Sequence, residues 1–112
     1  LSTPTGSTAY NLSVGGPIVV PESHSIILSP IAPHNLNVRP LVLPDSATLR
    51  LSVDTREPNF QLALDSRTTD LSTDTEVTVR KAAYTLKMIR IENISFYRTL
   101  RNKLMWGADK RN

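Results

Sequence analysis

Short runs of alternating apolar and polar residues recur through the middle of the chain. Leu49, Leu51 and Val53 alternate with polar neighbours, and a period of two returns in residues 59–64 and 76–80. Such alternation is typical of strands with one face on a core and the other in water. Turn-forming residues separate the runs roughly every eight to twelve residues, which predicts antiparallel meanders in a mainly β, two-sheet, β-sandwich-like domain.

The flanking regions predict four further elements. Residues 6–14 begin with small capping residues and stop at a Gly-Gly-Pro turn, which predicts two turns of helix. Apolar runs predict strands at residues 25–28, 38–43 and 84–92. The apolar positions of the last strand change phase, which indicates a bulge or burial on both faces.

Apolar residues at helical spacing predict a helix near the C-terminus. Phe96, Leu100 and Leu104 follow Ser95, a suitable N-cap, and Gly107 is the expected stop. The last seventeen residues hold five basic residues and one acidic residue, so they account for the net charge of +3. This pattern favours a solvated helix face over a nucleic-acid surface, which needs a basic face with aromatic residues for stacking.

Composition narrows the class of protein further. A chain of 112 residues that is 39% hydrophobic indicates one small domain with a core. Cysteine is absent, which excludes disulfides and thiolate metal sites and fits a cytoplasmic location, and His24 and His34 lack zinc-ligand spacing. No apolar run approaches the roughly 20 residues that cross a bilayer, so we expect no membrane partner.

Residues 3–10, Thr-Pro-Thr-Gly-Ser-Thr-Ala-Tyr, are the segment most suggestive of binding. The glycine would let backbone approach a ligand, and free N–H groups at a helix start can bind an adenine edge, a ribose or a phosphate. Tyr10 offers a ring for stacking on a base, and Thr8 and Ser13 offer hydroxyls. Small residues also open many purely structural helices, so the pattern alone leaves both interpretations open.

Three ordered blocks of the chain resemble the NAD kinase family. Residues 3–19 are similar to its C-terminal signature, and residues 30–45, which begin Pro-Ile-Ala-Pro-His, are similar to a second signature. Phe96, Leu100 and Trp106-Gly107 resemble its closing element. The resemblance implies that residues 1–112 are a partial C-terminal, NAD-binding β domain, and that an N-terminal α/β domain with a Gly-Gly-Asp-Gly loop is missing.

The resemblance also implies the reaction of the complete enzyme. NAD kinases transfer a phosphoryl group from ATP or polyphosphate to the adenosine ribose 2′-hydroxyl of NAD and so make NADP, with a divalent metal, expected to be magnesium. The candidate base is the aspartate of the Gly-Gly-Asp-Gly loop, so we expect this chain alone to be inactive. Relatives are commonly dimers or tetramers, and their C-terminal segment packs on the N-terminal domain, which leaves that segment here mobile or paired with another copy.

The resemblance implies that residues of this chain bind NAD. Thr8, Ala9 and Tyr10 match the segment that lies against the nucleotide in relatives, and Ser13 matches a position near the other end of the dinucleotide. Many relatives have Asp-Gly where this chain has Asp65 and Ser66, and some place the residue after the aspartate against a neighbouring subunit's ligand. These two residues are site candidates or a plain surface turn, and no catalytic residue or metal ligand is assigned.

Two other classes of function remain open. A lipid kinase of the diacylglycerol or sphingosine type shares this architecture, although the Pro-Ile-Ala-Pro-His block speaks against it, and a non-catalytic β-sandwich binding module is the third class. Among the other polar residues, we expect His34 to satisfy buried backbone carbonyls and Arg39 to pair with an acid, or else to reach a ligand phosphate. Trp106 is expected to cover apolar surface.

Overall fold

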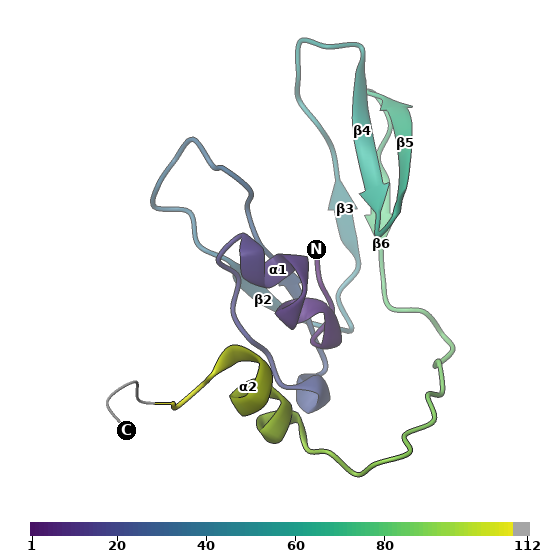
Figure 1. The fold of residues 1–112 in the computed structure, drawn as a ribbon. Helices are drawn as coiled ribbons and strands as arrows, with labels where there is room; N and C mark the ends of the chain where they lie inside the picture. The colour runs from purple at the N-terminus through teal and green to yellow at the C-terminus, as the bar shows by residue number, and fades with distance from the viewer. Residues whose placement is uncertain (109–112) are drawn as a thin grey trace. The chain divides into compact units, whose positions relative to one another are not determined.

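The structure is a computed structural model that describes residues 1–108. It is mainly β, with small sheets and a helical segment near each end (Figure 1). This confirms the predicted class, the short helical segment after the first loop and the C-terminal helix. None of the helices within the described range is long and apolar enough to cross a membrane. The elements are the 3-10 turns Thr5–Thr8 and Pro21–Ser23, the helices α1 (Tyr10–Ser13) and α2 (Phe96–Leu104), and the strands β1 (Ser25–Leu28), β2 (Leu41–Pro44), β3 (Leu49–Leu51), β4 (Asn59–Leu64), β5 (Arg67–Ser72) and β6 (Val77–Val79).

Strands β1 to β6 pair antiparallel in three two-stranded sheets, β1–β2, β3–β6 and β4–β5. The predicted meander is therefore correct only for the β4–β5 hairpin. Strand β3 pairs with β6, with Leu51 opposite Val77, and the hairpin lies between these two strands in the sequence. Strand β2 begins at Leu41, three residues later than predicted, and includes Pro44. Packing of two sheets face to face stays a prediction.

The chain divides into two compact units, which are described separately. The first contains Leu1–Pro44 and the residues from Ala83 onward. Its centre is Ile27 of β1, whose side chain is fully buried. Strand β1 is paired on both edges, since Ser2 donates its N–H to Ile27 O (2.8 Å) and accepts from Ile27 N–H (2.9 Å), while β2 lies along the other edge. This bridge anchors the chain just before the Thr-Pro-Thr-Gly segment.

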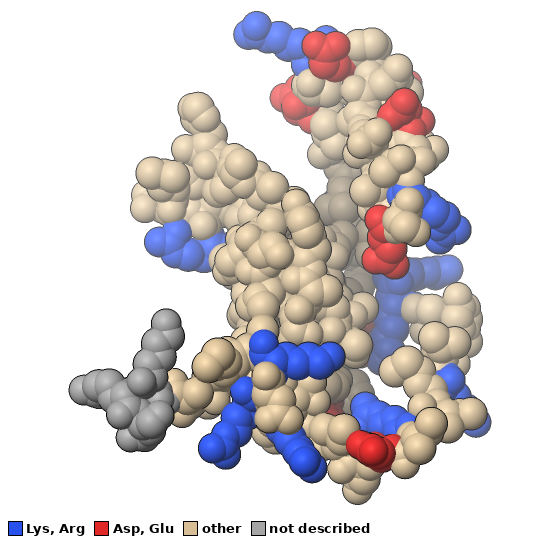
Figure 2. Space-filling model, viewed as in Figure 1, with Lys and Arg blue, Asp and Glu red and all other residues tan. Residues whose placement is uncertain are grey.

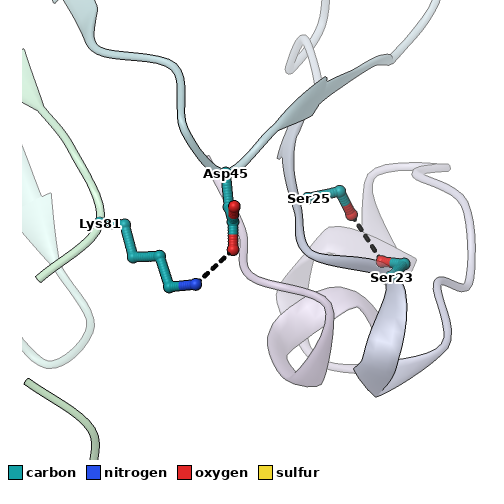
Figure 3. A network of polar contacts seen from close by, with 4 residues as sticks. All are labelled: Ser23, Ser25, Asp45 and Lys81. Carbon is teal, nitrogen blue, oxygen red and sulfur yellow. Dashed lines mark hydrogen bonds and ion pairs between the residues drawn. The ribbon is translucent and has the colours of Figure 1, made fainter.

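The second unit, Asp45–Ala82, contains the β3–β6 ribbon and the β4–β5 hairpin. Phe60 lies opposite Leu71, and both side chains are half-buried, so they form the apolar side of the hairpin. Lys81 donates to Asp45 Oδ2 at 2.5 Å and so joins the two ends of the unit; Figure 3 shows this ion pair. The figure also shows a contact within the first unit, between the hydroxyls of Ser23 and Ser25 at 2.7 Å.

The core of the described residues is smaller than the composition predicts. Ile27 is the one apolar side chain of residues 1–108 that is classed as buried, so the expectation of a substantial core within this chain is wrong. The strand predicted at 84–92 is also wrong, because residues 80–95 form no strand and the side chains of Ile89 and Ile91 are 96% and 98% exposed. A strand needs a partner for its backbone groups, and no described strand pairs with this segment.

Helix α2 begins as the sequence predicts. Ser95 Oγ accepts a hydrogen bond from Arg98 N–H at 3.2 Å, which confirms the N-cap. The helix ends two residues before the predicted stop, because Met105 already adopts the left-handed conformation at φ 53°, and Gly107 follows at φ 74°. Trp106 is 67% exposed in this chain, and its predicted role of covering apolar surface stays a prediction for the complete enzyme.

Basic side chains gather over α2 in Figure 2, while acidic and basic side chains mix over the β4–β5 hairpin. The helix carries Arg98, Arg101 and Lys103 and no acidic residue. All three side chains are exposed, which agrees with the predicted solvated face. The remaining basic residues of the tail, Lys110 and Arg111, lie outside the described residues.

Candidate functional site

The segment predicted to bind a nucleotide is two short turns rather than one continuous helix. The 3-10 turn Thr5–Thr8 and helix α1 are separated by Ala9, whose φ of −98° and ψ of −129° are not helical. Gly15 adopts a left-handed φ of 79° and donates its N–H to Leu12 O at 3.1 Å, which ends α1. The predicted helix at residues 6–14 is therefore correct in extent and interrupted in the middle.

The beginning of this segment is closed by its own hydrogen bonds. Gly6 donates its N–H to Thr3 Oγ1 and Ser7 donates its N–H to Pro4 O, both at 3.1 Å. A Cβ on Gly6 would lie 3.0 Å from Ser2 Oγ, so the glycine allows close packing within the turn, and the approach of a ligand to its backbone stays a prediction. The expectation of free, outward N–H groups is wrong for these two amides.

Two buried polar side chains, Ser7 and Asn11, hold the segment from inside; they are 0% and 7% exposed. Ser7 Oγ accepts from Val19 N–H at 3.0 Å and donates to Val19 O at 3.3 Å. Asn11 Nδ2 donates to Ser7 O and to Pro17 O, both at 3.0 Å, and its Oδ1 accepts from Ser29 Oγ at 2.5 Å. These bonds connect the 3-10 turn to residues 17–19, which follow the glycine turn, and to Ser29, which directly follows β1.

Sequence reasoning missed this inner pair. Apolar periodicity does not detect buried polar residues, and the break at Ala9 puts the two residues on separate helical segments. The sequence shows Gly16 only as part of the predicted turn, and the structure adds that a Cβ there would lie closer than 3.0 Å to the Asn11 amide group. Gly16 is thus the residue that makes room for the buried side chain.

The four residues predicted to contact NAD lie on the segment that Ser7 and Asn11 hold. Tyr10 is 69% exposed, Ala9 and Ser13 are exposed, and Thr8 is half-buried. The side chains of Tyr10 and Asn11 differ in direction because successive residues of a helix are about 100° apart. The aromatic ring and the hydroxyl of Ser13 are therefore accessible, while the neighbouring amide faces the interior.

Residues 1–38, which include this segment, carry almost no formal charge. Besides His24 and His34, Glu22 is the one acidic or basic residue within residues 1–38, and no Lys, Arg, Asp or Glu side chain covers α1 in Figure 2. The next cation along the chain, Arg39, donates to Leu36 O at 2.7 Å and to Val38 O at 3.2 Å, so it pins its own loop instead of pairing with an acid. A segment with so little charge of its own suits stacking and hydrogen bonding to a base or a sugar.

The remaining candidates lie elsewhere. Asp65, at φ 53°, and Ser66 form the exposed β4–β5 turn of the second unit, as the turn chemistry predicts, and nothing further distinguishes them as a site. His34 is exposed, so the prediction that it satisfies buried carbonyls is wrong. No group of three histidine, aspartate or glutamate side chains comes together within residues 1–108.

Comparison with known proteins identifies the family. Residues 1–91 match the ATP-NAD kinase C-terminal domain. The NAD kinases of Christiangramia forsetii and of Porphyromonas gingivalis (strain ATCC 33277) are 50% and 54% identical over 100% and 96% of this chain. The solved structure of yeast NADH kinase complexed with NADH covers 95% of this chain with a TM-score of 0.76 at 31% identity, and this chain covers 34% of it. Since this chain spans 38% of the length of the two curated relatives, the comparisons concern one part of a longer protein. The chain belongs to the NAD kinase family and corresponds to its C-terminal domain.

Proposed function

We propose that this chain is the dinucleotide-binding part of an NAD kinase and that Thr8, Ala9, Tyr10 and Ser13 contact NAD. The observation that carries the proposal is the orientation of the loop, whose aromatic ring and hydroxyl are exposed while Ser7 and Asn11 fasten its inner side. In this proposal the Tyr10 ring stacks on a planar group of the dinucleotide. The hydroxyls of Thr8 and Ser13 bind polar groups of the nucleoside.

The absence of charge within residues 1–38, apart from Glu22, refines the proposal. A neutral surface is suited to the uncharged nucleoside parts of NAD, whereas the pyrophosphate needs cationic or amide donors. We therefore assign nucleoside binding to this loop and pyrophosphate binding to other residues of the complete enzyme. The NADH named with the 31% identical yeast kinase supports a dinucleotide over the lipid substrate or the non-catalytic module.

The proposed reaction forms a bond between the ribose 2′-oxygen of NAD and the terminal phosphorus of ATP or polyphosphate. The bridging P–O bond of the donor breaks, and ADP or the shortened polyphosphate leaves. The 2′-hydroxyl proton passes to a base outside this chain, for which the aspartate of a Gly-Gly-Asp-Gly loop is the candidate. Phosphoryl transfer depends mainly on positioning, so residues that hold the nucleoside contribute by orienting the 2′-hydroxyl.

The described residues contain no cluster of three metal-ligating side chains, and no step is assigned to a metal on this chain. We propose that the remainder of the enzyme provides the donor and metal sites. It would also bury the apolar segment that includes Leu86, Ile89 and Ile91, whose side chains are 87% to 98% exposed. Contiguous exposed apolar residues of this kind usually mark packing surfaces. Two-sheet packing, a cytoplasmic location and assembly as a dimer or tetramer belong to the same proposal.

The test is a coupled assay of the full-length protein with NAD and either ATP or polyphosphate, read by an NADP-specific dehydrogenase. We expect NADP to form with the full-length protein and not with residues 1–112 alone. Isothermal titration of the full-length protein with NAD and NADP measures binding separately from turnover. If the full-length protein neither binds these dinucleotides nor makes NADP, the proposal is wrong, and phosphorylation of a lipid substrate would replace it.

A further inference from the structure

Asn11 uses its amide group to connect three segments that the backbone alone does not connect. Its Nδ2 bonds reach the 3-10 turn at Ser7 and the segment after the glycine turn at Pro17, and its Oδ1 bond comes from Ser29 at the end of β1. Both N–H donors are used, and no buried side-chain polar atom within the described residues lacks a partner. An amide suits this place because it donates and accepts at once without carrying a charge.

The α1 segment has little helical stability of its own. Helix α1 has four residues, and Ala9 breaks the chain of helical residues before it. Helices far shorter than about 12 residues are not stable in isolation, so side-chain contacts must fix the direction of such a turn. Asn11 directly follows the exposed Tyr10 and bonds to the carbonyl of the residue before Thr8, so its amide group fixes the positions from which both side chains project.

We infer that Asn11 is a positioning residue for dinucleotide binding, which acts by holding Tyr10 and Thr8 in the orientation that the ligand needs. The inference rests on the proposed function and assigns no ligand contact to Asn11 itself. Without the three hydrogen bonds of Asn11, the loop samples other orientations. The apparent affinity for NAD then falls in proportion to the fraction of molecules whose loop keeps the binding-competent orientation. The effect belongs to NAD binding and leaves the affinity for the phosphoryl donor unchanged.

The test compares variants of the full-length protein at a temperature where circular dichroism shows all of them to be folded. Asn11→Ser removes the long amide, and Ser29→Ala removes only the Oδ1 contact. Leu62→Ala, in the half-buried side of the β4–β5 hairpin, is the matched control for a general loss of stability. We expect the Kd for NAD, measured by isothermal titration, to rise roughly tenfold in Asn11→Ser and about two- to fivefold in Ser29→Ala.

The control should lower the melting temperature while keeping the wild-type Kd, and the KM for ATP or polyphosphate should stay unchanged in all three variants. A wild-type Kd for NAD in folded Asn11→Ser would overturn the inference. If Asn11→Ser does not fold, an unchanged Kd in Ser29→Ala overturns it, and so does an equal rise in Leu62→Ala. Absence of NAD binding in the unsubstituted protein would instead refute the proposed function.

Discussion

Substitution of Gly16 by alanine should disrupt the polar network beneath the proposed binding loop. An added Cβ would lie closer than 3.0 Å to Oδ1, Cγ and Nδ2 of Asn11, which no real contact tolerates, so the Asn11 side chain must move. That movement breaks its bonds to Ser7, Pro17 and Ser29. At about 0.5–1.5 kcal/mol for each of the three bonds, the expected cost is about 2–4 kcal/mol.

Gly15 provides the matched control. It adopts φ 79°, and an added Cβ there would have nothing within 4 Å, so Gly15→Ala carries only the backbone penalty of the left-handed region. That penalty is about 1–2 kcal/mol. The two variants add the same methyl group at adjacent positions, and only Gly16→Ala is expected to displace Asn11.

Hydrogen exchange of the full-length protein measures the local effect. Gly16 donates its N–H to Asn11 O at 2.8 Å and Val19 donates its N–H to Ser7 Oγ at 3.0 Å, so their amides report opening of the network. For Gly16→Ala, amide exchange at Val19 should accelerate roughly 30- to 700-fold. This range follows from the expected cost, because each 1.4 kcal/mol changes an equilibrium constant about tenfold. In an Asn11→Ala background the same substitution should add little, because the clash is gone. Equal acceleration in Gly15→Ala and Gly16→Ala, or a full effect in the Asn11→Ala background, would refute the reasoning.

Three further predictions concern separate features. Tyr10→Ala should raise the Kd for NAD roughly five- to tenfold in isothermal titration of the full-length protein while Tyr10→Phe keeps most of the affinity, and a larger loss in Tyr10→Phe would contradict stacking. The hydrogen bond from the Ser72 hydroxyl, followed by one from the backbone N–H of Asp74, lowers the pKa of the Asp74 carboxyl below 3.8. Because the pKa of Asp74 is lower in the folded state, these hydrogen bonds stabilise the fold above the unfolded pKa, and that stabilisation is lost as the pH falls through the folded pKa. NMR titration should show that the Asp74 pKa rises in Ser72→Ala. Ser95→Ala should destabilise α2 by about 1 kcal/mol, measured as faster exchange at Arg98 N–H, and unchanged exchange there would contradict the cap.

The elements that the sequence predicted correctly depend on local chemistry. The β4–β5 hairpin follows from the alternating run before Asp65 and from turn residues that tolerate a left-handed φ, here 53°. Helix α2 follows from Ser95 and the apolar spacing behind it, because a cap and a helical face involve only neighbouring residues. The residues proposed to contact NAD lie close together on one motif, and their contacts with the ligand stay a prediction.

What the sequence alone determined is therefore the set of local turns, the mainly β class, the loop and, through resemblance, the family. Tertiary structure decided that β3 pairs with β6, because strand pairing over long separations depends on contacts that local patterns do not encode. It also decided that Asn11 points inward beside Tyr10, since burial of a polar side chain depends on partners distant in sequence, such as Ser29, and on the space left by Gly16. The predicted strand at 84–92 failed for the same physical reason, because an apolar run becomes a strand only where a partner strand satisfies its backbone.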